Sequence, residues 1–174
     1  MDIHMRPATI DDCDALGLVI VTASLKTFLG NIPEEDFDFS WTPEVSANNW
    51  REFFTDGLSP EQFFMVAEMD QRVVGYVWAG RATGRPDYER AVDGLYVLPS
   101  VQCQGVGRAL LRYVANRLCD EGVNGLLIGC LKENPSCGFY QHLGGVEIFR
   151  QPRNYDRYAT EEIFFGWRDL QELL

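Results

Sequence analysis

The sequence lacks the features that mark membrane, secreted and metal-dependent proteins. No apolar run reaches the roughly 18 residues that a transmembrane helix needs, and the N-terminal segment has no signal-peptide pattern. The five cysteines form no CxxC pair, and the two histidines, His4 and His142, stand outside any ligand cluster. We therefore expect a cytoplasmic protein with reduced thiols, no membrane association and no metal site.

Basic residues are also scarce. The chain has 15 Lys and Arg against 26 Asp and Glu, which gives a formal net charge of −11. Because binding to a nucleic-acid backbone requires a basic surface, this balance argues against a nucleic-acid partner. An acidic surface would attract cationic amines, although it also serves solubility alone.

The length of 174 residues suits one domain, over residues 1–174. Hydrophobic periodicity predicts helices at 10–29, 43–55, 105–121 and 135–143. Strands are expected at 3–8, 63–67, 73–79, 91–98, 125–131, 145–150 and 159–167. The strand–helix–strand unit over 91–131 implies one parallel pair, whereas the hairpins imply antiparallel pairs. The expected fold class is α+β, with a mixed, mostly antiparallel sheet of about seven strands and helices on both faces.

The turn between the strand at 91–98 and the next helix has the pattern Q-x-x-G-x-G, formed by Gln102, Gly105 and Gly107. Glycines permit a close backbone approach, and the first turn of a helix has N–H groups without partners, so this turn favours an anion such as phosphate. Leu110 stands where a dinucleotide fingerprint needs a third glycine, and Arg108 stands where a P-loop needs lysine. Taken alone, the glycines could simply shape a tight turn.

This turn resembles the phosphate loop of the GCN5-related N-acetyltransferase (GNAT) family, whose motif is [Arg/Gln]-x-x-Gly-x-[Gly/Ala]. Residues 102–107 match it at every defined position, and the preceding Leu-Tyr-Val-x-Pro is similar to the family's lead-in. The resemblance implies that acetyl-CoA is the cofactor, with its pyrophosphate on the backbone of residues 102–108 and its pantetheine arm on the main chain of Val97. The cofactor-binding residues implied here are Leu95, Tyr96, Val97, Gln102, Cys103, Gln104, Gly105, Val106, Gly107 and Arg108.

A second segment, residues 134–145, is similar to the family's Asn-(x)n-Phe-Tyr-x-x-Leu-Gly-Phe block. It departs at Gly145, which replaces the usual aromatic residue and should affect packing more than chemistry. Asn134 before Pro135 predicts a helix N-cap, and the resemblance adds cofactor contacts from Asn134 and Phe139. Tyr140 would also contact the cofactor and act as the general acid that protonates the departing coenzyme A thiolate. The alternative for Tyr140 is a half-buried aromatic residue.

The family usually acts by direct attack of the amine, which must first lose a proton. Asp93 is the candidate base, and its position two residues before Leu95 and four before Val97 predicts that all three share one strand face. The alternative is a solvated strand carboxylate. Covalent catalysis by Cys103 or Cys137 is disfavoured, because neither motif holds a histidine placed to serve as the base.

The acceptor pocket is the least defined part of the sequence. Four aromatic residues could line it or belong to the core, namely Phe28, Trp41, Trp50 and Tyr88. Glu34, Glu35 or Asp36 could attract a cationic amine or lie on the surface. The resemblance thus implies acetyl transfer to a primary amine, of a small molecule in the first hypothesis. Protein N-acetylation and a non-catalytic acyl-CoA sensor are the alternatives, and a homodimer is possible because many relatives form one.

Overall fold

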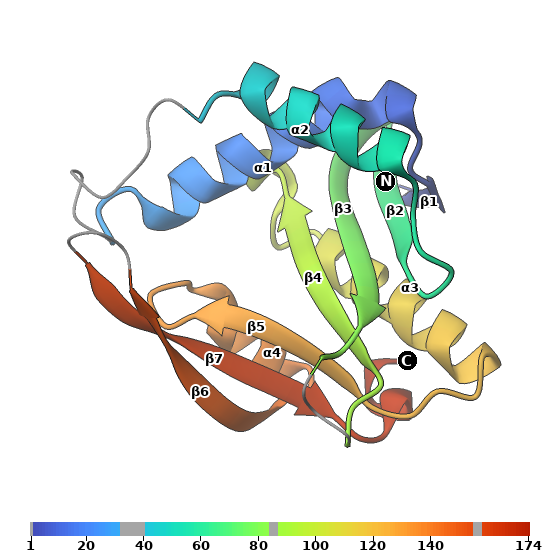
Figure 1. Ribbon diagram of the computed structural model, residues 1–174, viewed down its shortest axis with the longest axis vertical. Helices are drawn as coiled ribbons and strands as arrows, with labels where there is room; N and C mark the ends of the chain where they lie inside the picture. Colours follow the sequence, from blue (N-terminus) through green and yellow to red (C-terminus); the bar gives the residue numbers. More distant parts are fainter. Residues whose placement is uncertain (1, 32–40, 84–86, 155–157) are drawn as a thin grey trace.

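The computed structural model describes residues 2–31, 41–83, 87–154 and 158–174. Its centre is one seven-stranded sheet in the order β1-β2-β3-β4-β5-β7-β6 (Figure 1). The strands are β1 (His4–Pro7), β2 (Phe63–Met69), β3 (Arg72–Arg81), β4 (Arg90–Val97), β5 (Leu126–Leu131), β6 (Val146–Asn154) and β7 (Ala159–Trp167). The pair formed by β4 and β5 is parallel, and the other neighbouring pairs are antiparallel. The expected fold class is confirmed.

The four helices are α1 (Cys13–Phe28), α2 (Pro43–Asp56), α3 (Val106–Asp120) and α4 (Ser136–His142). The helix predicted from residue 10 opens with a short 3-10 turn, Ile10–Asp12, in which the Thr9 N–H donates to Asp12 Oδ2 at 2.8 Å. The strand predicted at 145–150 continues to Asn154. Within the described ranges, no helix combines the length and apolar character needed to span a bilayer.

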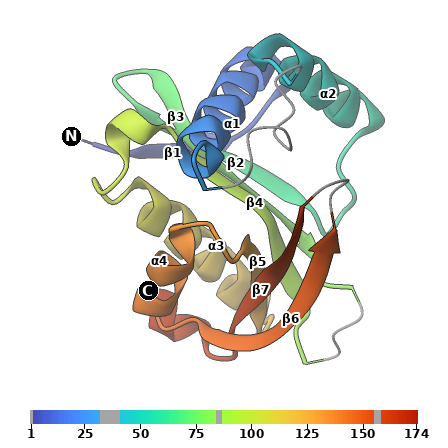
Figure 2. The same cartoon turned by 90° about the vertical axis from the view of Figure 1, so that its left-hand side faces the viewer.

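Helices cover both faces of the sheet, with α1 and α2 on one face and α3 and α4 on the other (Figure 2). Strand β2 explains why helices are needed on both faces. Its residues 63–67 are all buried, and their side chains point alternately into two cores. Phe63 and Met65 pack with residues of α3, in what we call the α3 core. Phe64 and Val66 pack with α1 and with Trp50 of α2, in what we call the α1/α2 core. A strand that is apolar on both faces requires a helical layer on each side.

Strands β4 and β5 separate soon after they meet. Their pairing covers three positions, from Arg90 opposite Leu126 to Val92 opposite Ile128, and the strands then diverge (Figure 1). The rest of β4 therefore borders an opening in the sheet on its β5 side.

A bulge lies in β4 where this divergence starts. Trp78 of β3 pairs with Gly94 and the next residue, Ala79, pairs with Val92, so that Asp93 is the extra residue. The bulge interrupts the alternation of side chains. Leu95 packs with the α3 core, whereas the Asp93 carboxylate lies next to Gly80 and Gln62. The expectation that Asp93 shares a strand face with Leu95 and Val97 is therefore wrong.

Candidate active site

A cavity of about 300 Å³ lies between the start of α3, the start of α4 and the second half of β4. We call it the α3–α4 cavity. Seven of the predicted cofactor-binding residues line it: Leu95, Val97, Gln102, Cys103, Gly107, Asn134 and Phe139. Four further lining residues were not predicted from the sequence: Lys26, Thr27, Pro135 and Ser136. The structure thus brings the two sequence motifs, about 30 residues apart, into one site.

The turn before α3 presents a row of unpaired backbone donors. Among the described residues, none accepts a hydrogen bond from the backbone N–H groups of residues 103–108, and the first such bond of the helix runs from Ala109 N to Gly105 O at 2.9 Å. Gly105 has φ 89°, a left-handed conformation in which other residues are strained. Together, these N–H groups and the helix dipole favour an anion at this end of α3.

Side chains fix the loop and the helix beside it. Gln102 donates from Nε2 to the Val97 carbonyl at 3.1 Å, which ties the loop to the end of β4. Gly107 leaves room for the ring of Phe139, since a Cβ at Gly107 would stand 3.3 Å from that ring. The loop and α4 can therefore approach each other closely only while residue 107 has no side chain.

The start of α4 is capped as the sequence predicts. Asn134 Oδ1 accepts a hydrogen bond from the Ser136 backbone N–H at 2.8 Å, although the helix itself begins at Ser136. Further along, Tyr140 is buried at 5% exposure, with its ring 5.3 Å from that of Phe139. Burial raises the pKa of the Tyr140 hydroxyl, so this group is a proton donor rather than a phenolate. Phe139 lines the α3–α4 cavity, whereas Tyr140, whose ring contacts that of Phe139, does not line it.

The absence of an aromatic residue at Gly145 has a clear packing reason. A Cβ at Gly145 would stand 2.7 Å from the indole of Trp167. Trp167 is 1% exposed, and its Nε1 donates to the Leu143 carbonyl at 2.8 Å. Trp167, contributed by β7, therefore occupies the space beside the end of α4.

The other predicted cofactor residues do not line this cavity. The ring of Tyr96 lies in the α1/α2 core, 5.4 Å from that of Tyr76. Val106 is buried in the α3 core, and Gln104 donates to the Ser100 carbonyl at 3.2 Å. The side chain of Arg108 is exposed. For Gly105 and Val106, the structure leaves the backbone N–H as the group available to a ligand, whereas Gln104 and Arg108 also have exposed side chains.

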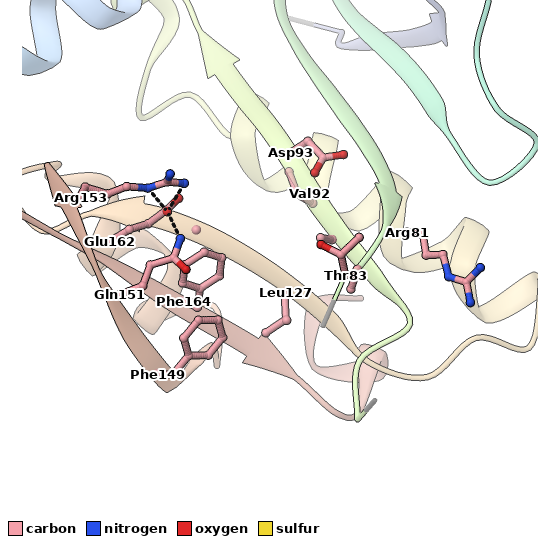
Figure 3. A pocket seen from close by; sticks show the side chains of 13 residues that line it. Arg81, Thr83, Val92, Asp93, Leu127, Phe149, Gln151, Arg153, Glu162 and Phe164 are labelled. Carbon is pink, nitrogen blue, oxygen red and sulfur yellow. Dashed lines mark hydrogen bonds and ion pairs between the residues drawn. The ribbon is translucent and has the colours of Figure 1, made fainter. Parts of the chain in front are cut away.

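A second cavity, of about 530 Å³, lies on the face of the sheet that α3 does not cover. We call it the open-face cavity, and Figure 3 shows its lining side chains. Leu127 and Gly129 of β5 line it, whereas their neighbours Leu126 and Ile128 point into the α3 core. Strand β4 borders both cavities, with Val92 and Asp93 at the open-face cavity and Leu95 and Val97 at the α3–α4 cavity.

Strands β6 and β7 form one wall of the open-face cavity. Phe149 and Phe164 stack with their ring centroids 4.3 Å apart. Above them, Glu162 accepts a hydrogen bond from Gln151 at 2.8 Å and forms an ion pair with Arg153 at 2.6 Å (Figure 3). Gly129 of β5 makes room for the Glu162 carboxylate, with which any Cβ at that position would collide.

Asp93 of β4 lies across the cavity from this wall (Figure 3). No described residue forms a hydrogen bond or ion pair with its carboxylate. Although the residue as a whole is exposed, its carboxyl group sits in the recess, and desolvation there raises its pKa. A carboxylate with these properties can accept a proton.

The predicted acceptor residues lie elsewhere. Trp50 and Tyr88 are buried, with Trp50 in the α1/α2 core, so the alternative that they are core residues is correct. Phe28 and Trp41 line neither cavity. Glu34, Glu35 and Asp36 lie outside the described residues.

Cys137 is poorly suited to act as a nucleophile. Its Sγ lies 3.2 Å from Cys130 Sγ and 3.4 Å from the Leu131 carbonyl. Burial raises the pKa of the Cys137 thiol, which keeps it protonated. This geometry argues against an acyl-enzyme at Cys137.

Comparison with known proteins identifies a matching family. Residues 27–145 match the model of the acetyltransferase (GNAT) family. The uncharacterized N-acetyltransferase YuaI of Bacillus subtilis (strain 168) is 24% identical over 172 residues, which cover 98% of this chain and 96% of YuaI.

Solved structures share the fold at lower identity. An N-acetyltransferase from Staphylococcus aureus Mu50 superposes with a TM-score of 0.72 at 17% identity, covering 98% of this chain and 99% of that one. The PaiA N-acetyltransferase from Thermoplasma acidophilum, solved in complex with coenzyme A, gives 0.69 at 16% identity, with 97% and 99% covered.

Proposed function

The chain belongs to the GNAT family of acetyltransferases, and from this premise we propose that it acetylates the primary amine of a small molecule bound in the open-face cavity. The observation that carries the proposal is the position of β4 between two cavities. One cavity holds the family's two cofactor motifs, and the other holds an uncompensated carboxylate.

Acetyl-CoA is the co-substrate of this family, and the residues of the α3–α4 cavity suit it. The free N–H groups of residues 103–108 would hold the pyrophosphate, and Lys26 at the cavity rim would add a positive charge. Leu95, Val97 and Phe139 provide an apolar lining for the pantetheine arm. When bound, acetyl-CoA supplies an activated acetyl thioester.

Two residues of the chain would then transfer protons, one as a base and one as an acid. Asp93, as carboxylate, accepts a proton from the ammonium form of the acceptor and leaves a neutral, nucleophilic amine. Tyr140, which keeps its hydroxyl proton, donates it to the departing sulfur, and the second proton that the nitrogen loses on becoming an amide restores the Tyr140 hydroxyl. Because Tyr140 contacts Phe139 without lining the α3–α4 cavity, this step requires the departing sulfur to pass the Phe139 ring.

The test is acetyl-CoA consumption, followed as free thiol, with polyamines, aminoglycosides, amino acids and short peptides as acceptors. Turnover of small amines is the expected result. Turnover of peptides alone would favour protein N-acetylation instead. Binding of acetyl-CoA without turnover of any acceptor would favour the acyl-CoA sensor and contradict the proposal.

A further inference from the structure

The Arg153 guanidinium is held at the open-face cavity by Glu162. Arg153 Nε lies 2.7 Å and a terminal nitrogen 2.6 Å from Glu162 Oε2, and Gln151 donates to the same oxygen at 2.8 Å. The side chain extends from β6 toward β4 (Figure 3). Its remaining N–H groups have no partner among the residues that the structure describes. Arg153 thus offers fixed donors to a molecule in the cavity.

The two walls of the cavity differ in charge. Glu162 is neutralised by Arg153, whereas Asp93 on the opposite wall has no cation among the described residues. The other lining cation, Arg81, is 72% exposed, lies 3.8 Å from Glu61 and extends away from the cavity (Figure 3). The cavity therefore accommodates one ammonium group beside Asp93. A polyamine would bring a second positive charge toward Arg153, which is unfavourable.

We propose that Arg153 binds an acidic group of the acceptor, so that the acceptor is an amine that also carries a carboxylate. This inference rests on the proposed acetyltransferase function, in which the amine lies beside Asp93. A guanidinium presents N–H groups in a fork that matches a carboxylate. The stacked rings of Phe149 and Phe164 supply an apolar surface on the Arg153 wall for the rest of the molecule.

The test uses matched sets of acceptors: the standard amino acids, their carboxamides and the amines formed by their decarboxylation, with spermidine added. Free-thiol release gives kcat/KM for each. The expected result is at least one amino acid that is used about tenfold better than its amide and its decarboxylated amine, because a site built to bind a carboxylate discriminates against analogues without it.

Variants assign that preference to Arg153. In Arg153→Gln, the ratio of kcat/KM for the acid to kcat/KM for its amide should fall close to one. Arg153→Lys should restore part of this ratio, because it returns the positive charge. Arg150→Gln is the matched control, because Arg150 lies on the same strand, pairs with Glu147 and Glu161, and lines neither cavity. The control should keep the ratio of the unmodified protein.

Other outcomes would overturn the inference. Equal use of acid, amide and amine, a preference for spermidine, or an Arg153→Gln variant that slows acid and amide alike would each contradict it. Acetylation of amines without a carboxylate as efficiently as of the matched acids would leave the proposed function standing and reject only the role of Arg153. Failure of every acceptor, or of acetyl-CoA binding measured by calorimetry, would reject the proposed function as well.

Discussion

The ring of Phe139 lies against the backbone of Gly107, so that loop and helix meet where the α3–α4 cavity is lined by both. Gly107→Ala would bring a methyl group within 3.3 Å of that ring and displace it. We expect acetyl-CoA to bind several-fold more weakly, with little change in thermal stability, because α4 can shift slightly. Gly138→Ala is the control, since a Cβ there meets no atom within 4 Å. Equal affinities of the two variants would contradict the packing role of Gly107.

The hydroxyl of Tyr140 can be removed without removing its ring. In Tyr140→Phe the aromatic contacts with Phe139 and Phe165 persist, whereas the proposed proton donor is lost. We expect kcat to fall by about 100-fold, a common value for the loss of a general acid, with the Kd for acetyl-CoA changed far less. Calorimetry and steady-state kinetics separate the two. A weaker affinity at an unchanged rate per bound complex would make Tyr140 a structural residue.

Asp93 should leave a signature in the pH profile. Burial raises the pKa of its carboxyl, and a base must be deprotonated, so kcat/KM should rise with pH through a value above the usual one for aspartate. Asp93→Asn should lower kcat/KM about 100-fold or more and abolish that rise. A profile in which the rise survives the substitution would assign the proton transfer to another group.

The same carboxyl should cost stability at neutral pH. A raised folded-state pKa favours the fold at pH values below the unfolded pKa, and this contribution is lost as the pH rises through the folded value. Asp93→Asn should therefore have a higher Tm than the unmodified chain at pH 7.5, and the difference should vanish near pH 4. Thermal unfolding followed by circular dichroism at both pH values checks this.

Asp12 should show the opposite dependence on pH. Burial alone would raise the pKa of its carboxyl, but hydrogen bonds from Arg6, at 2.7 and 2.8 Å, and from Thr9 outweigh burial and lower it. This carboxyl therefore stabilises the fold above its unfolded pKa, and the contribution is lost as the pH falls through the folded value. Asp12→Asn should cost about 2 kcal/mol of unfolding free energy at pH 7. In urea unfolding at pH 3 the difference should shrink, and an undiminished difference would count against the ion pair.

Gly145 should not tolerate a side chain. Gly145→Ala would place a methyl group 2.7 Å from the Trp167 indole and 2.8 Å from the Tyr140 carbonyl, both of which are fixed by packing. We expect a loss of about 1–3 kcal/mol of unfolding free energy, the usual cost of overfilling a core. Chemical denaturation measures it. A neutral result would mean that Trp167 can move aside.

The sequence was sufficient for the parts of the site that depend on local pattern. Gln102, Gly105 and Gly107 lie between β4 and the first turn of α3, and the hydrophobic periodicity on either side of them predicted the strand and the helix that opens with free N–H groups. The cap at Asn134 is equally local. These elements follow from neighbouring residues, which a sequence displays directly.

The rest depends on contacts between distant segments. The β4 bulge is defined by the register of β4 against Trp78 and Ala79, which no pattern within residues 91–98 reveals. Arg153 and Glu162 meet only because β6 pairs with β7, and neither residue stands in a recognisable motif. The sequence left two positions open for Trp50, at a pocket or in the core. The structure shows it buried in the α1/α2 core.

The extra residue at Asp93 divides β4 into two parts, one at the open-face cavity and one at the α3–α4 cavity. Residues 91–93 line the open-face cavity, although Val92 is also buried in the α3 core. Under the proposed function, substitutions at Ala91 or Asp93 would change the acceptor side and leave Leu95 and Val97 at the α3–α4 cavity untouched. Deleting Asp93 would restore strict alternation with both halves of the strand still on their present faces, because Val92 already pairs with Ala79 and Gly94 with Trp78. The inserted residue thus adds one carboxylate to the open-face cavity without changing the face of the sheet on which any other residue of β4 lies.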